Sequence, residues 1–414
     1  MAKQLNVAIV GLGMAGLTLA RQVAAGEIES LNLVAVCDSP ERLALLDEPG
    51  MKKPQLRWTP TGDAVQLASL DEPAMRNASR FSTYESMLRE APCDIVAIAT
   101  PHIFHAAQAI AAMKAGRHVF CEKPLGVSTL EVNEVIKCAQ ETGRLLAVNL
   151  NRRLEPTHQQ LKQLLSEGSM GPITRVALTA TAWFRPQIYF SSSPWRATWA
   201  GEGGGLLLNQ APHSLDLLQW TCGMPSRVRS FCGFGKHHEI EAEDDVTAYM
   251  EFPSGATGIF TASTGELPGV DRLEISTDRG RLVLEGSRLE LSRTSGSVRE
   301  FTHSATDAFA HMSVLRSVLD VPDKADLICG VLRNLVEAIR TGSPVLCPAQ
   351  DALGSLELAN AMLLSTWLDS WVSLPLDAAM FDEHLRRRQK QSSLRPVANK
   401  TWSLEASLRM EPKK

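Results

Sequence analysis

Two short stretches, far apart in the chain, place a lysine and a histidine where they could move protons. Residues 121–124 read Cys-Glu-Lys-Pro, and residues 209–213 read Asn-Gln-Ala-Pro-His. Lys123 follows an apolar run typical of a buried strand and precedes a proline, which restricts the backbone. A histidine can take up a proton near neutral pH, and a lysine can stabilise a developing negative charge. We therefore expect these stretches to handle protons beside a redox cofactor.

Each of these residues also has a simpler interpretation. Lysines usually lie in solvent at the protein surface. Asn209 is a natural N-cap for a helix predicted over residues 210–221, and His213 could be a satisfied, half-buried side chain. Asn209 and His213 are four residues apart, so both side chains can face one spot near the start of that helix. Asp216, three residues further on, could orient the histidine.

A glycine-rich loop between an apolar strand and a helix predicts where the cofactor binds. Residues 6–10 form a short apolar run, residues 11–16 read Gly-Leu-Gly-Met-Ala-Gly, and residues 17–25 have a helical pattern. The glycines permit a tight turn and let the backbone approach a pyrophosphate at the helix N-terminus. The predicted contacts in this loop are Gly11, Gly13, Met14 and Ala15.

An acidic residue after the second predicted strand indicates which dinucleotide binds. The strand covers residues 31–37, and Asp38 follows it, 22 residues after Gly16. A carboxylate at this place can hold both ribose hydroxyls of NAD, and it would repel a 2′-phosphate. We therefore expect NAD, with Ser39 as a further contact. NADP is the alternative, because Arg42 lies four residues after Asp38.

Strands and helices alternate up to about residue 150, which predicts a doubly wound parallel sheet of class α/β. Residues 47–80 interrupt the pattern with several prolines and read as a surface excursion. Thr100 and Pro101 end a strand at the carboxyl edge, where such sheets bind ligands. We therefore assign residues 1–150 to a Rossmann dinucleotide-binding domain and expect both residues to contact the cofactor.

The chain from residue 151 to residue 382 has a different pattern. Hairpins of alternating strands at residues 246–262 and 273–284 predict a large open, mostly antiparallel sheet in an α+β domain. Long apolar-striped helices are predicted at residues 327–340 and 352–371. The open face of such a sheet needs cover from helices or from another subunit, so we expect a homodimer or homotetramer.

Residues 183–199 hold six aromatic side chains together with Arg185 and Arg196. Aromatic faces beside arginines suit a carbohydrate-like ligand, whose C–H face stacks while its hydroxyls accept hydrogen bonds. The alternative is a hydrophobic plug beneath a long loop, at a subunit interface. We take Trp195 and Arg196 as candidate substrate contacts, followed by a flexible glycine-rich stretch at residues 201–205.

Composition and charge exclude several classes of protein. The 414 residues are 44% hydrophobic and 21% charged, with a net charge of −4, so the overall charge does not attract nucleic acid or an anionic membrane. The sequence has no apolar run long enough for a transmembrane helix. Its eight cysteines lack metal-ligand spacing, which predicts no metal and free thiols in a reducing, cytoplasmic compartment. Residues 383–414 are basic and could touch nucleic acid or acidic lipid, but we expect a solvated or subunit-embracing extension.

Taken together, the motifs resemble those of the Gfo/Idh/MocA family of oxidoreductases, from residue 5 to about residue 376. The resemblance implies a Rossmann domain, a second domain with a large open sheet, and NAD(P)-dependent oxidation or reduction of a secondary alcohol on a sugar, cyclitol or related compound. The matching motifs are the glycine loop, Thr100-Pro101 with His105, Glu122-Lys123-Pro124, Asn151-Arg152-Arg153, and residues 203–213.

The resemblance also implies roles for single residues. Lys123 lies by the nicotinamide and the substrate hydroxyl, often before a cis peptide bond, and His213 is the usual acid/base. His105 and Glu122 lie near the cofactor, and Arg153 lies near the substrate. Family members frequently have aspartate four residues before the histidine, where this chain has Asn209. A neutral amide can orient a hydroxyl but cannot raise the basicity of the histidine by charge.

We therefore expect an NAD(P)-dependent dehydrogenase that oxidises or reduces a secondary ring hydroxyl of a sugar, glycoside or cyclitol. His213 would accept the proton, Lys123 would stabilise the negative charge on oxygen, and Asn209 would hold a neighbouring hydroxyl. One alternative is a lyase or glycosidase that oxidises the sugar transiently and recycles NAD. Another is a non-catalytic dinucleotide-binding regulator, which would need neither Lys123 nor His213.

Overall fold

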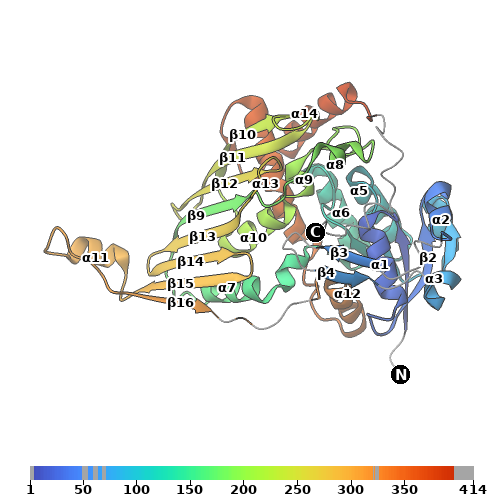
Figure 1. Cartoon of the computed structure of the whole chain (residues 1–414), viewed down its shortest axis with the longest axis horizontal. Coiled ribbons are helices and arrows are strands. Elements are labelled where there is room, and N and C mark those ends of the chain that lie inside the picture. The colour runs from blue at the N-terminus through green and yellow to red at the C-terminus, as the bar shows by residue number, and fades with distance from the viewer. Residues whose placement is uncertain are drawn as a thin grey trace.

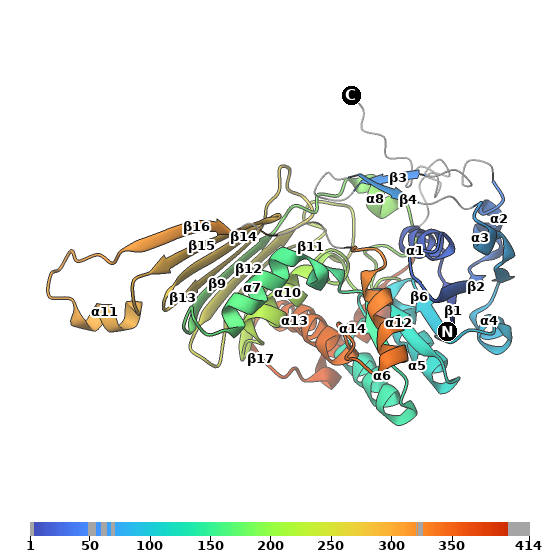
Figure 2. The same ribbon diagram turned by 90° about the horizontal axis from the view of Figure 1, so that it is seen from below.

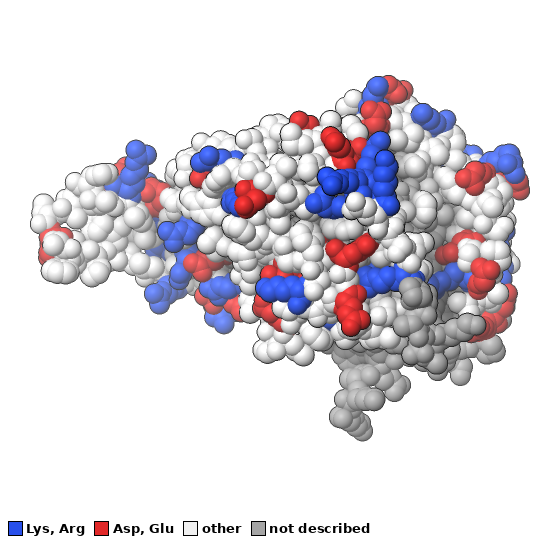
Figure 3. Space-filling view, turned by 90° about the horizontal axis from the view of Figure 1, so that it is seen from above, with Lys and Arg blue, Asp and Glu red and all other residues white. Residues whose placement is uncertain are grey.

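The computed structural model describes residues 4–48, 71–319, 321 and 326–395, and the backbone of residues 55–58 and 64–67 (Figure 1). Two sheets divide these residues between a nucleotide-binding part and a larger, flatter part. No helix of the described residues is long and apolar enough to cross a membrane. Acidic and basic side chains are intermixed over the face shown in Figure 3.

The first sheet has six parallel strands in the order β5-β2-β1-β6-β7-β8, which confirms the predicted Rossmann sheet. Its central strands are apolar and buried because helices cover both faces of the sheet. The strands are β1 (Leu5–Val10), β2 (Leu31–Cys37), β5 (Ser79–Phe81), β6 (Ile95–Ile98), β7 (His118–Cys121) and β8 (Leu146–Val148). The helices are α1 (Met14–Ala24), α2 (Pro40–Leu45), α4 (Tyr84–Glu90), α5 (His105–Lys114) and α6 (Thr129–Thr142).

The predicted surface excursion at residues 47–80 is partly wrong. Its last residues form α3 (Pro73–Asn77) and most of β5, and β5 pairs in parallel with β2 as the edge strand of the Rossmann sheet. Earlier in the excursion, β3 (Gln55–Trp58) and β4 (Ala64–Leu67) form an antiparallel pair. The prolines made this segment look irregular, although Pro73 begins a helix, a position at which proline is tolerated.

The second sheet has nine strands in the order β16-β15-β14-β13-β9-β12-β11-β10-β17, and every neighbouring pair except β9 with β12 is antiparallel. Both predicted hairpins are present, whereas the edge strands β16 and β17 were not predicted. The strands are β9 (Ile173–Ala180), β10 (Arg227–Phe234), β11 (Glu243–Glu251), β12 (Thr257–Ser263), β13 (Asp271–Thr277), β14 (Gly280–Glu285), β15 (Arg288–Thr294), β16 (Val314–Leu319) and β17 (Val372–Ser373).

Helices cover one face of this sheet, and β15, β16 and α11 project away from the rest of the chain (Figures 1 and 2). The other face exposes apolar side chains, among them Phe231, Tyr249 and Ile259. The helices of this part are α7 (Pro156–Ser166), α8 (Gln187–Ser191), α9 (Leu206–Asn209), α10 (Pro212–Cys222), α11 (Val298–Ser304), α12 (Gly330–Thr341), α13 (Ala349–Leu368) and α14 (Ala378–Gln391).

Helix α13 joins the two parts because it packs on α6 of the first and on α10 of the second. The Asn360 side chain accepts a hydrogen bond from the Thr129 amide (3.0 Å) and donates one to the Val127 carbonyl (3.2 Å). The predicted start of the basic extension, at residue 383, falls inside α14, which buries Phe381 and Leu385. Residues 383–391 therefore belong to the folded domain, and residues 396–414 lie outside the described residues.

Candidate active site

The glycine loop connects β1 to α1 at the carboxyl edge of the Rossmann sheet. Gly11 has φ +88°, and a Cβ there would lie 2.5 Å from the Ala99 carbonyl carbon. A Cβ on Gly16 would lie 1.8 Å from the Gly11 oxygen, so packing demands glycine at both positions. A Cβ on Gly13 would meet nothing within 4 Å. This open side, at the N-terminus of α1, fits a pyrophosphate.

Asp38 lies beside this loop, at the end of β2. One carboxylate oxygen accepts a hydrogen bond from the Leu12 amide (2.5 Å), and the other accepts one from the Ser39 amide (2.7 Å). Both bonds hold the carboxylate at the loop, where an adenosine ribose would bind. The loop and Asp38 therefore form a site that fits NAD, as the sequence predicts.

His105 ties together the two loops that lead from the sheet to the cofactor. Its buried ring places Nδ1 2.7 Å from the Pro124 carbonyl oxygen and Nε2 2.7 Å from the Thr100 carbonyl oxygen. With both ring nitrogens engaged by backbone, His105 positions the loops rather than binding the cofactor directly. The Thr100 hydroxyl in turn donates to the Gln108 side chain (2.6 Å).

Lys123 reaches from the Rossmann domain to the second domain. Its peptide bond to Pro124 is cis, and its ammonium Nζ donates to the backbone carbonyl of Asn209 at 2.6 Å. Burial lowers the pKa of Lys123, and the charges of Glu122 and Glu202 partly offset this effect. The lysine that follows β7 and the helix that precedes His213 are therefore in direct contact.

The predicted N-cap role of Asn209 is wrong. Asn209 ends the short helix α9, and α10 begins at Pro212 with Ala211 as its N-cap residue. The Asn209 side chain instead donates to the Glu202 carboxylate and accepts a hydrogen bond from the Tyr189 hydroxyl (3.4 Å). Because a turn separates α9 from α10, the Asn209 side chain does not cap α10. It instead fixes the segment whose backbone carbonyl bonds to Lys123.

His213 lies in the first turn of α10 as a half-buried side chain. Its Nδ1 is buried and has no hydrogen-bond partner among the described residues. Burial lowers the pKa of His213 well below its usual value, and the nearby cation of Lys123 lowers it further. The imidazole is therefore neutral near pH 7, as a general base must be.

Arg153 and Asp216 have roles that differ from those predicted. The Arg153 guanidinium donates two hydrogen bonds to Asp216 (2.8 and 2.6 Å) and one to Asp351 (2.5 Å), and it stacks 5.3 Å from the Trp220 ring centroid. Arg153 and Asp216 are both buried. Asp216 therefore does not orient His213, and we reassign Arg153 from substrate binding to this buried ion pair.

Replacing Arg153 with methionine is expected to lower the free energy of unfolding by about 3–5 kcal/mol, because Asp216 would keep a buried charge without its cationic partner. Denaturant titration followed by circular dichroism would measure the loss. A second replacement, Asp216→Leu in the same chain, should restore much of the stability. A single Arg153→Met variant as stable as the wild type would contradict the assignment.

Glu202 is a site residue that the sequence reasoning missed. Its buried carboxylate accepts hydrogen bonds from the Ala197 amide (2.5 Å) and from the Asn209 amide, and lies 3.9 Å from His102 Nδ1. Burial raises the pKa of Glu202, and the charge of Arg196 opposes this. A single acidic residue inside a run of glycines was the available signal. The chain thus carries at position 202 the carboxylate that it lacks at position 209.

The Glu202→Gln variant is expected to lower kcat by about 10- to 100-fold, because a hydrogen bond to a charged group contributes about 1.5–3 kcal/mol. The charge of Glu202 raises the pKa of Lys123, so its loss should also move the alkaline limb of the kcat/KM profile to lower pH. Steady-state kinetics across pH would measure both changes. Glu134→Gln, on the exposed face of α6, is the control. An unshifted alkaline limb would contradict this role.

Some aromatic side chains at residues 183–199 fit the predicted hydrophobic plug, and others fit the predicted substrate contacts. Phe190 and Trp199 are buried, as expected of a plug. Tyr189 and Trp195 are half-buried and carry the Arg196 guanidinium 4.3 and 4.7 Å from their ring centroids. Trp195 also meets the edge of His102, with ring centroids 5.8 Å apart, on the loop that follows Thr100. The stretch therefore lines the junction between the two domains.

The last described residues hold this stretch in place. Arg395 donates to the carbonyls of Arg196 (2.9 Å) and Ala197 (3.1 Å), and its amide donates to the Pro194 carbonyl (3.0 Å). The Ser392 hydroxyl accepts a hydrogen bond from the Ala200 amide (3.0 Å). Ser392 and Arg395, which follow α14, thus clasp the loop that carries Trp195 and Arg196.

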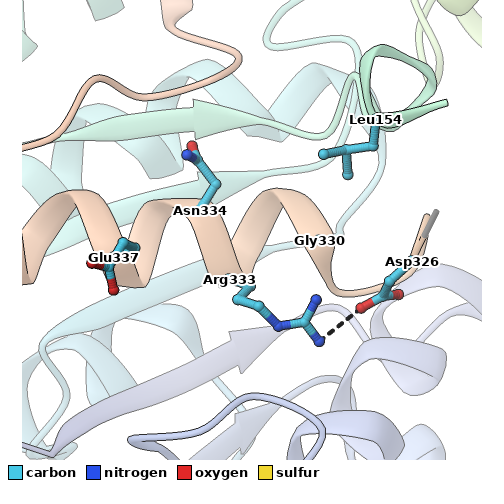
Figure 4. Close-up of a pocket in the computed structure, with 6 residues that line it drawn as sticks. All are labelled: Leu154, Asp326, Gly330, Arg333, Asn334 and Glu337. Carbon is cyan, nitrogen blue, oxygen red and sulfur yellow. Dashed lines mark ion pairs between the residues drawn. The ribbon is translucent and has the colours of Figure 1, made fainter. Parts of the chain in front are cut away.

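A pocket elsewhere in the molecule contains none of the predicted site residues. It lies at the start of α12, where Arg333 pairs with Asp326 at 2.9 Å and donates to the Glu27 carbonyl at 2.8 Å (Figure 4). Its walls are an ion pair and helix side chains, without a buried titratable group. This pocket is therefore separate from the candidate site at the carboxyl edge of the Rossmann sheet.

A Rossmann domain whose lysine contacts the short helix just before a neutral histidine defines a class, the two-domain nicotinamide-dependent oxidoreductases. Residues 5–150 match the family model described as "Oxidoreductase family, NAD-binding Rossmann fold", and residues 158–283 match the model of the GFO/IDH/MocA C-terminal domain. The chain belongs to the Gfo/Idh/MocA family of oxidoreductases, and its first domain binds NAD.

Individual relatives act on diols and sugars. Trans-1,2-dihydrobenzene-1,2-diol dehydrogenase of Oryctolagus cuniculus is 30% identical over 44% of this chain and 53% of its own length. The 1,5-anhydro-D-fructose reductase of Ensifer adhaerens is 27% identical over 43% and 53%. The chain thus spans about half the length of these curated relatives. The WlbA dehydrogenase of Bordetella pertussis, solved with NADH and UDP-GlcNAcA, has a TM-score of 0.73 and 25% identity, covering 91% of this chain and 99% of that one.

Proposed function

We propose that this protein is an NAD-dependent dehydrogenase that oxidises a secondary ring hydroxyl of a sugar, glycoside or cyclitol, or reduces the corresponding ketone. The observation that carries the proposal is the 2.6 Å contact between Lys123 and the Asn209 carbonyl, which joins the lysine to the segment preceding His213. The diol and sugar enzymes among its relatives support this substrate class.

In the proposed reaction, His213 and Lys123 have separate roles. NAD, which the glycine loop and Asp38 would hold, would supply the acceptor for the hydride that leaves the carbinol carbon. His213, neutral near pH 7, takes the hydroxyl proton, and the Lys123 ammonium stabilises the negative charge that develops on the same oxygen. Asn209 acts through its carbonyl, which aims Lys123, while Glu202 and Tyr189 hold its side chain. This replaces the expectation that Asn209 holds a neighbouring hydroxyl.

A spectrophotometric screen for NADH over inositols, anhydrosugars, glycosides and sugar acids tests the proposal. A dehydrogenase produces NADH in step with the oxidised sugar. Cleavage of a glycoside without net NADH would indicate a lyase or glycosidase that recycles NAD. Tight NAD binding without turnover of any compound, in either direction, would contradict the proposal and favour a regulator. Repeating active reactions with NADP tests the NAD preference that we infer from Asp38.

We also infer a homodimer or homotetramer, because one face of the nine-stranded sheet exposes Phe231, Tyr249 and Ile259. Light scattering coupled to size-exclusion chromatography measures this directly, and a monomer at micromolar concentration would contradict it. The eight cysteines are free thiols in the structure, which supports a reducing compartment such as the cytoplasm.

A further inference from the structure

Two arginines converge on one aromatic ring at the domain junction. The guanidinium carbon of Arg196 lies 4.3 Å from the Tyr189 ring centroid, and that of Arg185 lies 5.0 Å from it. Arg196 also donates from Nη1 to the Tyr189 hydroxyl at 2.6 Å. Two like charges are therefore held at the same side chain, an arrangement that costs free energy unless a negative charge joins them.

Neither arginine has an acidic partner among the described residues, although both are half-buried. The Nε atom of each arginine is buried and has no hydrogen-bond partner in the described part of the structure. Nearby Arg152 differs, because it pairs with Asp271 at 2.8 Å. Glu202 does act on Arg196 through its charge, but its carboxylate is already bonded to backbone and to an amide.

The backbone holds both arginines in place before any ligand binds. The Arg185 amide donates to the Thr264 carbonyl (2.9 Å), and its carbonyl lies 2.7 Å from Nε2 of the buried His238. The Arg196 carbonyl accepts from Arg395 at 2.9 Å. Elements from three distant parts of the chain thus fix the pair, as expected of a preorganised binding site.

Hydrogen bonds connect this pair to the reacting group. Arg196 bonds to the Tyr189 hydroxyl, which donates to the Asn209 side chain at 3.4 Å, and the Asn209 carbonyl accepts from Lys123 at 2.6 Å. A ligand group held by the arginines would therefore lie in the same junction as the oxygen that Lys123 stabilises. This places the anion on the substrate and not on the pyrophosphate of NAD, which belongs at the glycine loop.

We propose that Arg185 and Arg196 form a subsite for a carboxylate carried by the substrate ring, so that the substrate class is a sugar acid or its glycoside. The planar guanidinium fork matches a planar carboxylate, so that two arginines held at one tyrosine ring can bind the same carboxylate. This inference rests on the proposed function and narrows its substrate class.

Calorimetry on the NAD-loaded protein tests the subsite without requiring turnover. The probes are methyl glycosides of glucuronic, galacturonic and mannuronic acid, each compared with the neutral glycoside and with its 6-phosphate. We expect at least one acid to bind about 10- to 100-fold more tightly than its neutral partner. Equal binding of acid and neutral forms in all three sugars would overturn the proposal, as would binding of the phosphates alone.

Variants assign the preference to the two arginines. Arg185→Gln and Arg196→Gln should each abolish most of the preference for the acid, whereas Arg196→Lys should keep part of it because the charge remains. Arg340→Gln, on the exposed side of α12, is the matched control. Unchanged acid binding in both glutamine variants would overturn the proposal. Acid binding without oxidation of any bound sugar would leave the subsite standing and refute the proposed dehydrogenase.

Discussion

Replacing Lys123 with alanine is expected to lower kcat for NADH formation by about 100- to 1,000-fold, the usual loss when a group that stabilises an oxyanion is removed. NAD affinity should change little, because the glycine loop and Asp38 lie at a separate part of the sheet edge. Stopped-flow or steady-state kinetics and an NAD titration would measure the two quantities separately.

The matched control for this variant is Lys114→Ala, which removes an exposed lysine at the end of α5. It should leave both kcat and NAD affinity unchanged. Near wild-type turnover in Lys123→Ala would show that the lysine only braces the Asn209 carbonyl. A parallel loss of NAD binding would show instead that the Glu122–Lys123 loop had lost its shape.

Replacing His213 with asparagine is expected to lower kcat by about 100- to 10,000-fold, the range typical of a lost general base. Because the buried Nδ1 already lacks a partner, the smaller amide should be accommodated without unfolding. Kinetics at pH 7 and a thermal melt would establish both points. Replacing the exposed His303 in α11 by asparagine is the control, and equal losses in the two variants would refute the assignment.

The pH dependence follows from the same two groups. Burial and the Lys123 cation lower the pKa of His213, so the base form persists below pH 6.5 and the acid limb of kcat/KM should lie below that value. Burial also lowers the pKa of Lys123, whose charged form is required, so activity should fall on the alkaline side before pH 10.5. The His213→Asn variant should lose the acid limb and keep the alkaline one. A wild-type acid limb above pH 6.5 would contradict the assignment of His213.

Local patterns in the sequence predicted the cofactor half of the site. A buried strand followed by a glycine loop and a helix is a contiguous signal in the sequence, although the structure also requires Gly11 because of its close approach to Ala99 after β6. Asp38 could be placed by its spacing alone, and the structure puts its carboxylate on the Leu12 amide. Lys123 was predictable for a similar reason, since it directly follows a buried strand.

The substrate half depends on contacts between distant residues, which spacing does not encode. The position of Asn209, four residues before His213, suggested a helix cap, but a turn intervenes and the amide bonds to Glu202 and Tyr189. Arg153 likewise bonds to Asp216, 63 residues away in the sequence, so we no longer assign it to substrate binding. Edge strand β16 was missed because its apolar residues do not alternate with polar ones.

The clasp formed by the residues after α14 connects the C-terminal segment to the rate at which ligands enter and leave the candidate active site. The loop at residues 194–200 belongs to no strand, and Arg395 and Ser392 bond to its backbone. Such a segment opens locally at a lower free energy than a buried strand. Hydrogen exchange in this loop therefore reports on the tail as much as on the substrate. Changes beyond the last helix, such as a truncation or an appended peptide, would alter substrate exchange while leaving the cofactor domain untouched.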